Sequence, residues 1–189
     1  VLILLLKLTN TIHGRQSSPQ APLQGWRPPP AGSYKINVDG AVKSGDFVRG
    51  VGVVVRNANG EFMGACVRRI QASYGARQTE LMATIEGLRY AIDMGFTAAI
   101  LEMDAQDCLN SILSTEEYNG IDDLLIEEVN YLLNNFRAVV CHWTPRCGNK
   151  VAHTLAQFAF HCNEFVTWIE EAPSWLLPVL EADVLSLEC

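Results

Sequence analysis

Alternating polar and apolar positions early in the central part of the chain predict three β-strands. Polar and apolar residues alternate in Lys35–Val42, valine and glycine dominate Val48–Asn57, and Phe62–Gln71 follows. The turn Asn57-Ala-Asn-Gly60 separates the second run from the third, and its Asn-Gly pair suits the positive φ angles of a tight hairpin. We therefore expect a three-strand meander.

The hydrophobic period then becomes helical over Arg77–Met94, and Gly95 is expected to end this helix. One apolar stripe is formed by Leu81, Ile85, Leu88 and Ile92. A second face carries small side chains, namely Ala83, Thr84, Gly87 and Ala91. Small residues let a helix approach a sheet closely, and this face would hold Glu80 over a strand.

The remaining elements complete an α/β pattern. The apolar run Ala98–Asp104 is typical of a central parallel strand that is covered on both sides. Two helices, one strand and a last helix are expected at Ala105–Leu113, Asp122–Asn135, Ala138–Trp143 and Asn149–Phe160. The order βββαβααβα predicts a mixed five-stranded sheet with helices on both faces.

Composition divides the 189 residues into three parts. Residues 1–33 form an extension that ends in the proline-rich run Trp26-Arg-Pro-Pro-Pro, residues 34–161 form the folded domain, and residues 162–189 form a tail that is acidic. The formal net charge of −7 gives no basic footprint of the kind that nucleic-acid binding usually leaves. The six cysteines form no Cys-x-x-Cys pair, which favours free thiols in a reducing compartment.

The opening run Val-Leu-Ile-Leu-Leu-Leu is far shorter than the roughly 20 residues that a membrane helix needs. We therefore expect no membrane association and an intracellular protein, cytoplasmic or nuclear. The run is consistent with the end of an upstream element, so the chain can be a fragment of a longer protein.

Three acids stand at points where predicted elements begin or end. Asp39 lies in the first strand, Glu80 near the start of the first helix, and Asp104 at the end of the fourth strand. Carboxylates placed in this way can converge on one divalent cation, Mg²⁺ or Mn²⁺. Each acid also has a simpler interpretation. Asp39 can face solvent with its strand neighbours, Glu80 can complement the helix dipole, and Asp104 can cap the following helix.

Five motifs together resemble the ribonuclease H-like domain of plant retrotransposon-derived, reverse-transcriptase-like proteins. They are Lys-Ile-Asn-Val-Asp39-Gly-Ala, Gly-Val-Gly-Val-Val-Val-Arg-Asn-Ala-Asn-Gly, Thr79-Glu80-Leu-Met-Ala, Leu-Glu-Met-Asp104, and His142-Trp-Thr-Pro-Arg-Cys-Gly-Asn149-Lys-Val-Ala-His153-Thr-Leu-Ala. The resemblance covers about Tyr34 to His161. It implies a ribonuclease H-like fold and an RNA–DNA hybrid endonuclease that uses two Mg²⁺ ions, leaves 5′-phosphate ends and acts as a monomer. It also implies a polymerase-like domain upstream in a longer parent protein.

The chain departs from the resemblance at the fourth acid, because His153 stands where catalytic members have aspartate. An imidazole is a poor ligand for Mg²⁺ and an acceptable one for Mn²⁺. His153 is either a weakened member of the catalytic set or a helix residue that binds nothing. The loop between Leu113 and Asp122 reads Ser-Thr-Glu-Glu-Tyr-Asn-Gly and is acidic, whereas some members of the family carry a basic protrusion there.

The resemblance also implies substrate contacts at Gly40, Gln78, Arg146 and Asn149. Gln78 can instead be an exposed residue at a helix start, and Asn149 can cap the last helix. Three functions remain open at this point. The chain is an active or weakly active nuclease, an inactive module that binds nucleic acid, or a protein-interaction domain derived from a mobile element.

Overall fold

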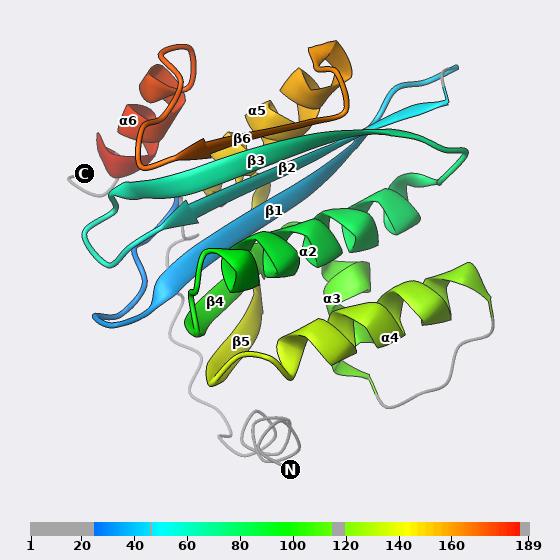
Figure 1. Cartoon of the computed structure of the whole chain (residues 1–189), viewed down its shortest axis with the longest axis horizontal. Helices are drawn as coiled ribbons and strands as arrows, with labels where there is room; N and C mark the ends of the chain where they lie inside the picture. Colours follow the sequence, from blue (N-terminus) through cyan, green and yellow to red (C-terminus); the bar gives the residue numbers. More distant parts are fainter. Residues whose placement is uncertain (1–24, 46, 115–119, 186–189) are drawn as a thin grey trace, which may run out of the picture.

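The computed structural model of the chain describes residues 25–45, 47–114 and 120–185, which form a mixed sheet with helices on both faces (Figure 1). The strands are β1 Tyr34–Val42, β2 Val48–Arg56, β3 Phe62–Gln71, β4 Ala98–Met103, β5 Ala138–Trp143 and β6 Phe165–Ile169. The helices are α2 Ala76–Asp93, α3 Gln106–Leu113, α4 Ile121–Leu133, α5 Lys150–Phe158 and α6 Leu177–Leu185, with short 3-10 turns at Arg146–Gly148 and Ala159–His161. The strand order across the sheet is β5-β4-β1-β2-β3-β6.

The predicted order of elements is confirmed from β1 to α5. β1, β2 and β3 are antiparallel neighbours, whereas β4 is parallel to both β1 and β5. Gly60 adopts a φ of 80° in the β2–β3 turn, as the Asn-Gly pair predicts. The crossover through α2 carries the chain from the meander to β4, which lies between β1 and β5.

The prediction of five strands is wrong, because the described residues contain a sixth strand. β6 pairs antiparallel with β3, from Arg68 opposite Phe165 to Gly64 opposite Ile169. The acidic composition of the region after Cys162 concealed this strand, although Phe-Val-Thr-Trp-Ile consists of β-branched and aromatic residues. The region that begins at Cys162 therefore contributes both a strand and α6 to the fold.

Two separate apolar clusters hold the helices to the sheet. The larger cluster joins α2, α3 and α4 to one face, and the smaller one joins α5 and α6 to the other. Leu81 and Leu88 of the predicted α2 stripe are fully buried, and so are Ala83 and Ala91 of its small-residue face. α2 is buried on both faces because it lies between the sheet and α4.

Glycines let α2 and α5 come unusually close to the central strands. A Cβ atom on Gly87 would lie 2.5 Å from Val38 Cγ1 of β1. A Cβ atom on Gly50 or Gly52 of β2 would lie 2.0 or 2.3 Å from the backbone of Ala156 in α5. These distances are too short for any larger residue, so the glycines fix how both helices sit above β1 and β2.

A buried polar network lies on the α5 and α6 side of the sheet. The Trp26 side chain is buried, donates a hydrogen bond of 2.9 Å from Nε1 to Asn37 Oδ1, and stacks under the Arg56 guanidinium. Arg56 in turn forms a 3.0 Å ion pair with Asp183 of α6. Trp26, which the sequence assigns to the proline-rich extension, is therefore packed into the domain.

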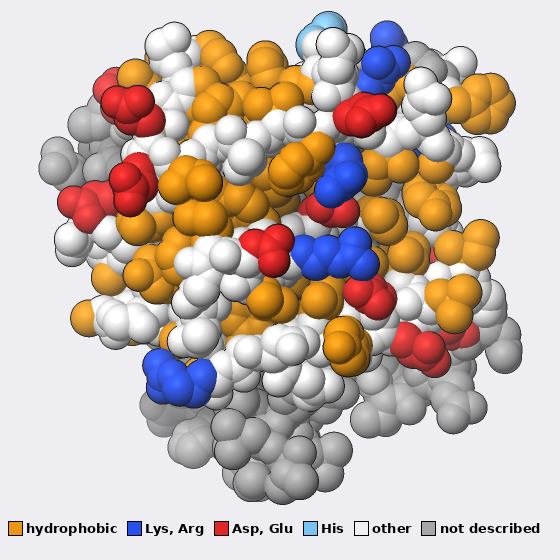
Figure 2. Space-filling view, in the orientation of Figure 1, with side chains coloured by type: hydrophobic (Ala, Val, Ile, Leu, Met, Phe, Trp, Pro, Cys, Tyr) orange, Lys and Arg blue, Asp and Glu red, His pale blue; other side chains and the backbone are white. Residues whose placement is uncertain are grey.

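Several sequence expectations concern residues outside the described ranges. The acidic loop falls largely on residues 115–119, and the opening apolar run lies within residues 1–24. Within the described ranges, no helix combines the length and the apolar character needed to cross a bilayer. On the face shown in Figure 2, basic side chains are interleaved with acidic ones and with hydrophobic surface. The described cysteines are free thiols, and four of them are buried.

Candidate active site

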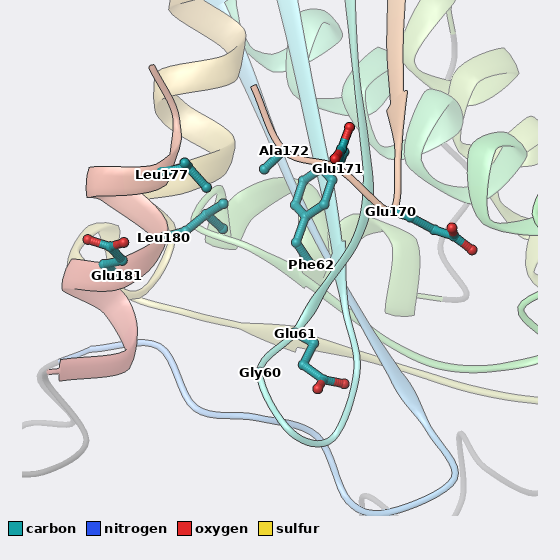
Figure 3. Close-up of a pocket in the computed structure, with 9 residues that line it drawn as sticks. All are labelled: Gly60, Glu61, Phe62, Glu170, Glu171, Ala172, Leu177, Leu180 and Glu181. Atoms are coloured by element: carbon teal, nitrogen blue, oxygen red, sulfur yellow. The ribbon is translucent and has the colours of Figure 1, made fainter. Parts of the chain in front are cut away.

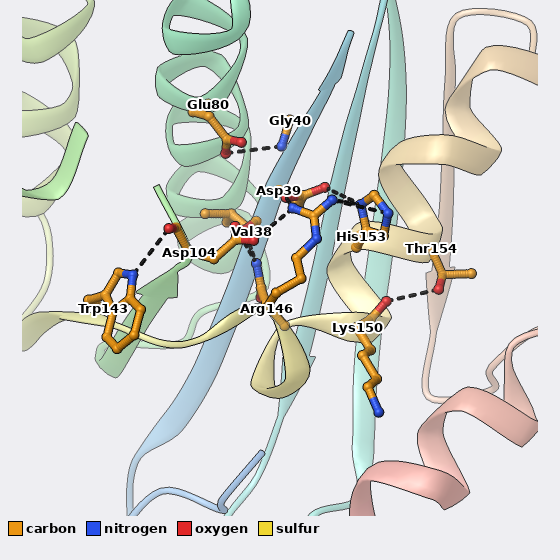
Figure 4. A network of polar contacts seen from close by, with 11 residues as sticks. Val38, Asp39, Gly40, Glu80, Asp104, Trp143, Arg146, Lys150, His153 and Thr154 are labelled. Atoms are coloured by element: carbon orange, nitrogen blue, oxygen red, sulfur yellow. Dashed lines mark hydrogen bonds and ion pairs between the residues drawn. The ribbon is translucent and has the colours of Figure 1, made fainter. Parts of the chain in front are cut away.

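The three predicted acids come together at one end of the sheet (Figure 4). Asp39 lies in the second half of β1, Glu80 in the first half of α2, and Asp104 directly after β4. One carboxylate oxygen from each residue lies within 4.8 Å of the other two. They are the one group of acids, histidines or cysteines in the described residues with the spacing of a metal site.

Strand pairing and one glycine bring these acids into register. β4 runs parallel to β1 with Asn37 opposite Glu102, so Asp39 and Asp104 lie two positions further along neighbouring strands. Gly40 allows α2 to begin directly above β1, because a Cβ atom there would lie 2.7 Å from the Thr79 carbonyl carbon. The Gly40 backbone N–H then donates a 3.1 Å hydrogen bond to Glu80 Oε2.

Two of the simpler interpretations of the acids are wrong. Asp39 does not face solvent, because its exposed fraction is 0% and its strand neighbours Lys35 and Asn37 are also buried. Asp104 does not cap α3, since the capping position is Ala105 and no side chain caps that helix. The Asp104 carboxylate is instead engaged with Arg146 and Asn149.

Arg146 lies between the carboxylates. Its Nη1 is 3.0 Å from Asp39 Oδ1 and 2.7 Å from Asp104 Oδ2. The side chain enters from the short turn that precedes α5, and it remains 54% exposed. In this structure the guanidinium supplies one positive charge, which offsets part of the negative charge of the two aspartates.

Asn149 is a buried residue of the site. It is 1% exposed, and its Nδ2 donates to the Val38 carbonyl at 2.9 Å and to Asp104 Oδ1 at 3.2 Å. Asn149 stands at the N-cap position of α5, as the capping interpretation predicts, but its side chain makes no capping bond to that helix. Asn149 Oδ1 is buried without a hydrogen-bond partner among the described residues.

His153 joins the same network from α5. Its Nδ1 lies 3.0 Å from Asp39 Oδ2. Arg146 Nη2 lies 2.5 Å from that same Nδ1 and 3.1 Å from Nε2, so the aspartate and the guanidinium both contact the ring. Whichever nitrogen carries a proton, an imidazole adds no negative charge to the cluster.

Burial and mutual repulsion raise the pKa of two of the acids. For Glu80, burial together with repulsion from Asp39 and Asp104 raises the pKa from 4.5 to about 9. For Asp39, burial raises the pKa from 3.8 to about 6, although the hydrogen bond from His153 and the charge of Arg146 act in the opposite direction. The cluster holds more negative charge than its surroundings stabilise.

These residues fit a divalent cation. Carboxylate oxygens are the hard ligands that Mg²⁺ and Mn²⁺ accept, and Asp39, Glu80 and Asp104 each offer one. A cation would also remove the repulsion that raises the pKa of Glu80.

The remaining predicted substrate residues are Gly40, which lies in β1 and packs against the first turns of α2, and Gln78, which lies at the start of α2. Gly40 contacts Glu80 as described above. The Gln78 side chain accepts a 2.9 Å hydrogen bond from the Gly75 backbone and donates a 2.6 Å bond to Asp122 of α4. Both ends of its amide are thus used in joining the start of α2 to α4.

The sequence patterns did not indicate the role of Trp143 at the edge of the site. Its indole N–H donates a 3.1 Å hydrogen bond to the Asp104 carbonyl, and much of the ring is exposed. The apolar run Ala138–Trp143 predicted a strand, but the sequence contained no signal for the hydrogen bond from Trp143 to Asp104. Gly52 was also missed, although it lies opposite Asp39 and lets α5 bring His153 to the site.

Comparisons with known proteins agree with this fold. A family described as reverse transcriptase-like matches residues 37–159. RNase H1 from the halophilic archaeon Halobacterium salinarum is 25% identical with a TM-score of 0.64, and the match covers 69% of this chain and 98% of that one. The N-terminal RNase H domain of a Mycobacterium tuberculosis protein is 26% identical with a TM-score of 0.62, covering 68% of this chain and 94% of that one.

A third structure shares the fold at lower identity. LC11-RNase H1, isolated from compost by a metagenomic approach and solved in complex with an RNA/DNA hybrid, is 16% identical with a TM-score of 0.60. That match covers 68% of this chain and 96% of the other. No curated protein sequence matches the chain. The architecture is therefore the RNase H-like fold.

Proposed function

The chain belongs to the reverse transcriptase-like family, and from that premise we propose that it is a metal-dependent ribonuclease that binds RNA–DNA hybrids and cleaves their RNA strand. The single observation that carries the proposal is the meeting of Asp39, Glu80 and Asp104 within 4.8 Å in an RNase H-like fold. The expected products carry 5′-phosphate ends.

The three acids would hold Mg²⁺ or Mn²⁺. When bound, such ions neutralise phosphate charge and lower the pKa of an attacking water. Asp39 is central to the set because it is buried and contacts both Arg146 and His153. Asn149 holds Asp104 in place through its amide.

Substrate contacts would come from groups around the acids. The Arg146 fork suits a phosphate as well as a carboxylate, and its exposure leaves it free to turn toward a nucleic-acid strand. Gly40 of β1 packs against the start of α2, where Gln78 lies, and a contact from either residue to a 2′-hydroxyl would distinguish RNA from DNA. For Gln78 this contact requires release of its bond to Asp122.

A module that binds nucleic acid without cleaving it is the second candidate function. Two observations favour it: Arg146 already occupies the space between two carboxylates, and His153 brings no negative charge in the place of a fourth acid. Both features weaken the attraction of the site for a second cation.

A labelled RNA–DNA hybrid incubated with Mg²⁺, with Mn²⁺ and with EDTA tests the proposal. Metal-dependent cleavage of the RNA strand supports the nuclease. Salt-sensitive binding without cleavage supports the binding module, and no binding at low salt contradicts both. An RNA duplex run in parallel measures the preference for a hybrid.

Replacing His153 with aspartate is expected to strengthen the second cation site. The new carboxylate adds a negative charge beside Asp39, so calorimetry should detect a second equivalent of Mn²⁺, and hybrid cleavage should rise at least about tenfold. The matched control is His153→Asn, which removes the imidazole without adding charge. If the two variants behave alike, the missing acid does not limit this protein.

Replacing Arg146 with glutamine is expected to raise the affinity for divalent cations by about tenfold, or about 1.4 kcal/mol. The variant removes a positive charge that lies within 3.0 Å of two candidate ligands. Affinity for the hybrid should fall, since a phosphate contact is lost. Calorimetric titration with Mn²⁺ measures the first effect, and Arg146→Lys, which keeps the charge, should retain the weaker metal affinity.

A further inference from the structure

A second concave feature lies on the far side of the fold from the acid cluster. An open groove of about 950 Å³ is bounded by the β2–β3 turn, the chain between β6 and α6, and α6 itself (Figure 3). Its apolar surface comes from Phe62 at the start of β3, from Ala172, and from Leu177 and Leu180 of α6. The Leu177 side chain is 44% exposed, so apolar surface is available to a binding partner.

Glutamates surround this apolar floor. Glu61, Glu170, Glu171 and Glu181 line the groove, and all four are exposed. Among the described residues that line the groove there is no lysine or arginine. Glu61 accepts hydrogen bonds from the Asn57 and Asn59 amides, whereas the other three glutamates form no ion pair with any residue in the described part of the chain.

The groove and the acid cluster occupy opposite ends of the sheet. Asp39 lies in the second half of β1, opposite Gly52 of β2. The groove lies beyond the other end, where Lys35 pairs with Arg56 and β2 turns back through Gly60. A molecule bound in the groove would leave the carboxylates and Arg146 open to a second ligand.

We propose that this groove docks a basic, amphipathic peptide segment of a partner protein. The four glutamates would repel the phosphates of a nucleic acid and attract lysine or arginine. The apolar floor would bury leucine-like or aromatic side chains between those cations. The volume is in the range of sites that hold a few side chains of a ligand. The described residues that line the groove include none of the three candidate metal ligands.

The probe is a short labelled peptide with leucines along one helical face and lysines along the other, followed by fluorescence anisotropy with the full chain. The unchanged protein should bind it, and a peptide with glutamate at each lysine position should not bind. Glu181→Lys is expected to weaken binding about tenfold through charge reversal at the rim. Leu177→Ser should weaken it by a similar factor through the loss of apolar surface.

The matched control is Glu127→Lys on α4, which makes the same charge change on an exposed residue away from the groove. The proposal is overturned if the lysine peptide does not bind, or if Glu127→Lys weakens binding as much as Glu181→Lys does. It is also overturned if sedimentation shows dimers that Leu177→Ser dissociates, because a second copy of the chain would then occupy the groove.

Discussion

Replacing Trp26 with alanine is expected to lower the free energy of unfolding by about 3–5 kcal/mol. Trp26 is 1% exposed and contacts Asn37 of β1 and Arg56 of β2, so the variant leaves a large cavity against the central strands. It also removes the hydrogen bond to Asn37 and the ring that lies 3.6 Å from the Arg56 guanidinium carbon. Urea denaturation followed by circular dichroism measures the loss.

Two further variants separate the causes of that loss. Trp26→Phe keeps most of the ring and removes the indole N–H, so it should destabilise the protein less than alanine does. Trp143→Ala removes a tryptophan that is about half exposed and should cost much less. If the free energy of unfolding of Trp26→Ala lies within about 1 kcal/mol of the value for the unchanged chain, Trp26 is not part of the folded domain.

The network around Trp26 links stability to the site. Lys35, Asn37 and Asp39 alternate along one face of β1, and all three are buried. Lys35 Nζ contacts Glu102 Oε1 at 2.5 Å, and Asn37 donates to the other oxygen of that carboxylate at 3.1 Å. A strand face that is polar in sequence is therefore covered by Glu102 of β4, by Trp26 and by Arg56 of β2, and it carries Asp39 toward its end.

This face also shows where prediction from the sequence fails. Alternation identified β1 and the direction of its side chains, because the period of a strand is a local property. Whether the polar face meets water or protein depends on residues that are distant in the chain. Glu102 lies 65 positions from Asn37, and Asp183 lies 127 positions from Arg56. Local patterns contain no signal for such pairs.

The acids were predictable for a related reason. Asp104 follows an apolar run that reads clearly as a parallel strand, and Glu80 opens a helix with strong periodicity. Elements of this kind restrict where their ends can lie, since parallel strands present their carboxyl ends at one edge of a sheet. The position of Arg146 was not predictable, because the 3-10 turn that carries it has no periodicity.

Replacing Asp39 with asparagine is expected to weaken divalent-cation binding by at least about a hundredfold, or about 2.8 kcal/mol, and to abolish hybrid cleavage. Asp39 is fully buried among the candidate ligands, so no water-exposed acid can replace it. Asparagine keeps the shape of the side chain and its hydrogen-bonding capacity, which separates the lost charge from a lost fold. Calorimetry with Mn²⁺ and the labelled-hybrid assay measure the two effects.

The same variant should stabilise the metal-free protein at neutral and alkaline pH. The pKa of Asp39, about 6, and that of Glu80, about 9, lie above their ordinary values of 3.8 and 4.5. Stability that is present below pH 4 is therefore lost as the pH rises through 6 and then 9. Asp39→Asn removes the first of these losses and reduces the second, because repulsion from Asp39 contributes to the raised pKa of Glu80.

Cation binding should show the opposite dependence on pH. Below about pH 9 a cation must displace the Glu80 proton, so the affinity for the cation should fall by about tenfold for each unit by which the pH is lowered. Below about pH 6 the affinity should fall more steeply, because Asp39 also takes up a proton. Titrations in buffers of different ionisation enthalpy count the released protons. If affinity does not change between pH 6 and 9, Glu80 is not a ligand, and the cation is bound by the aspartates alone.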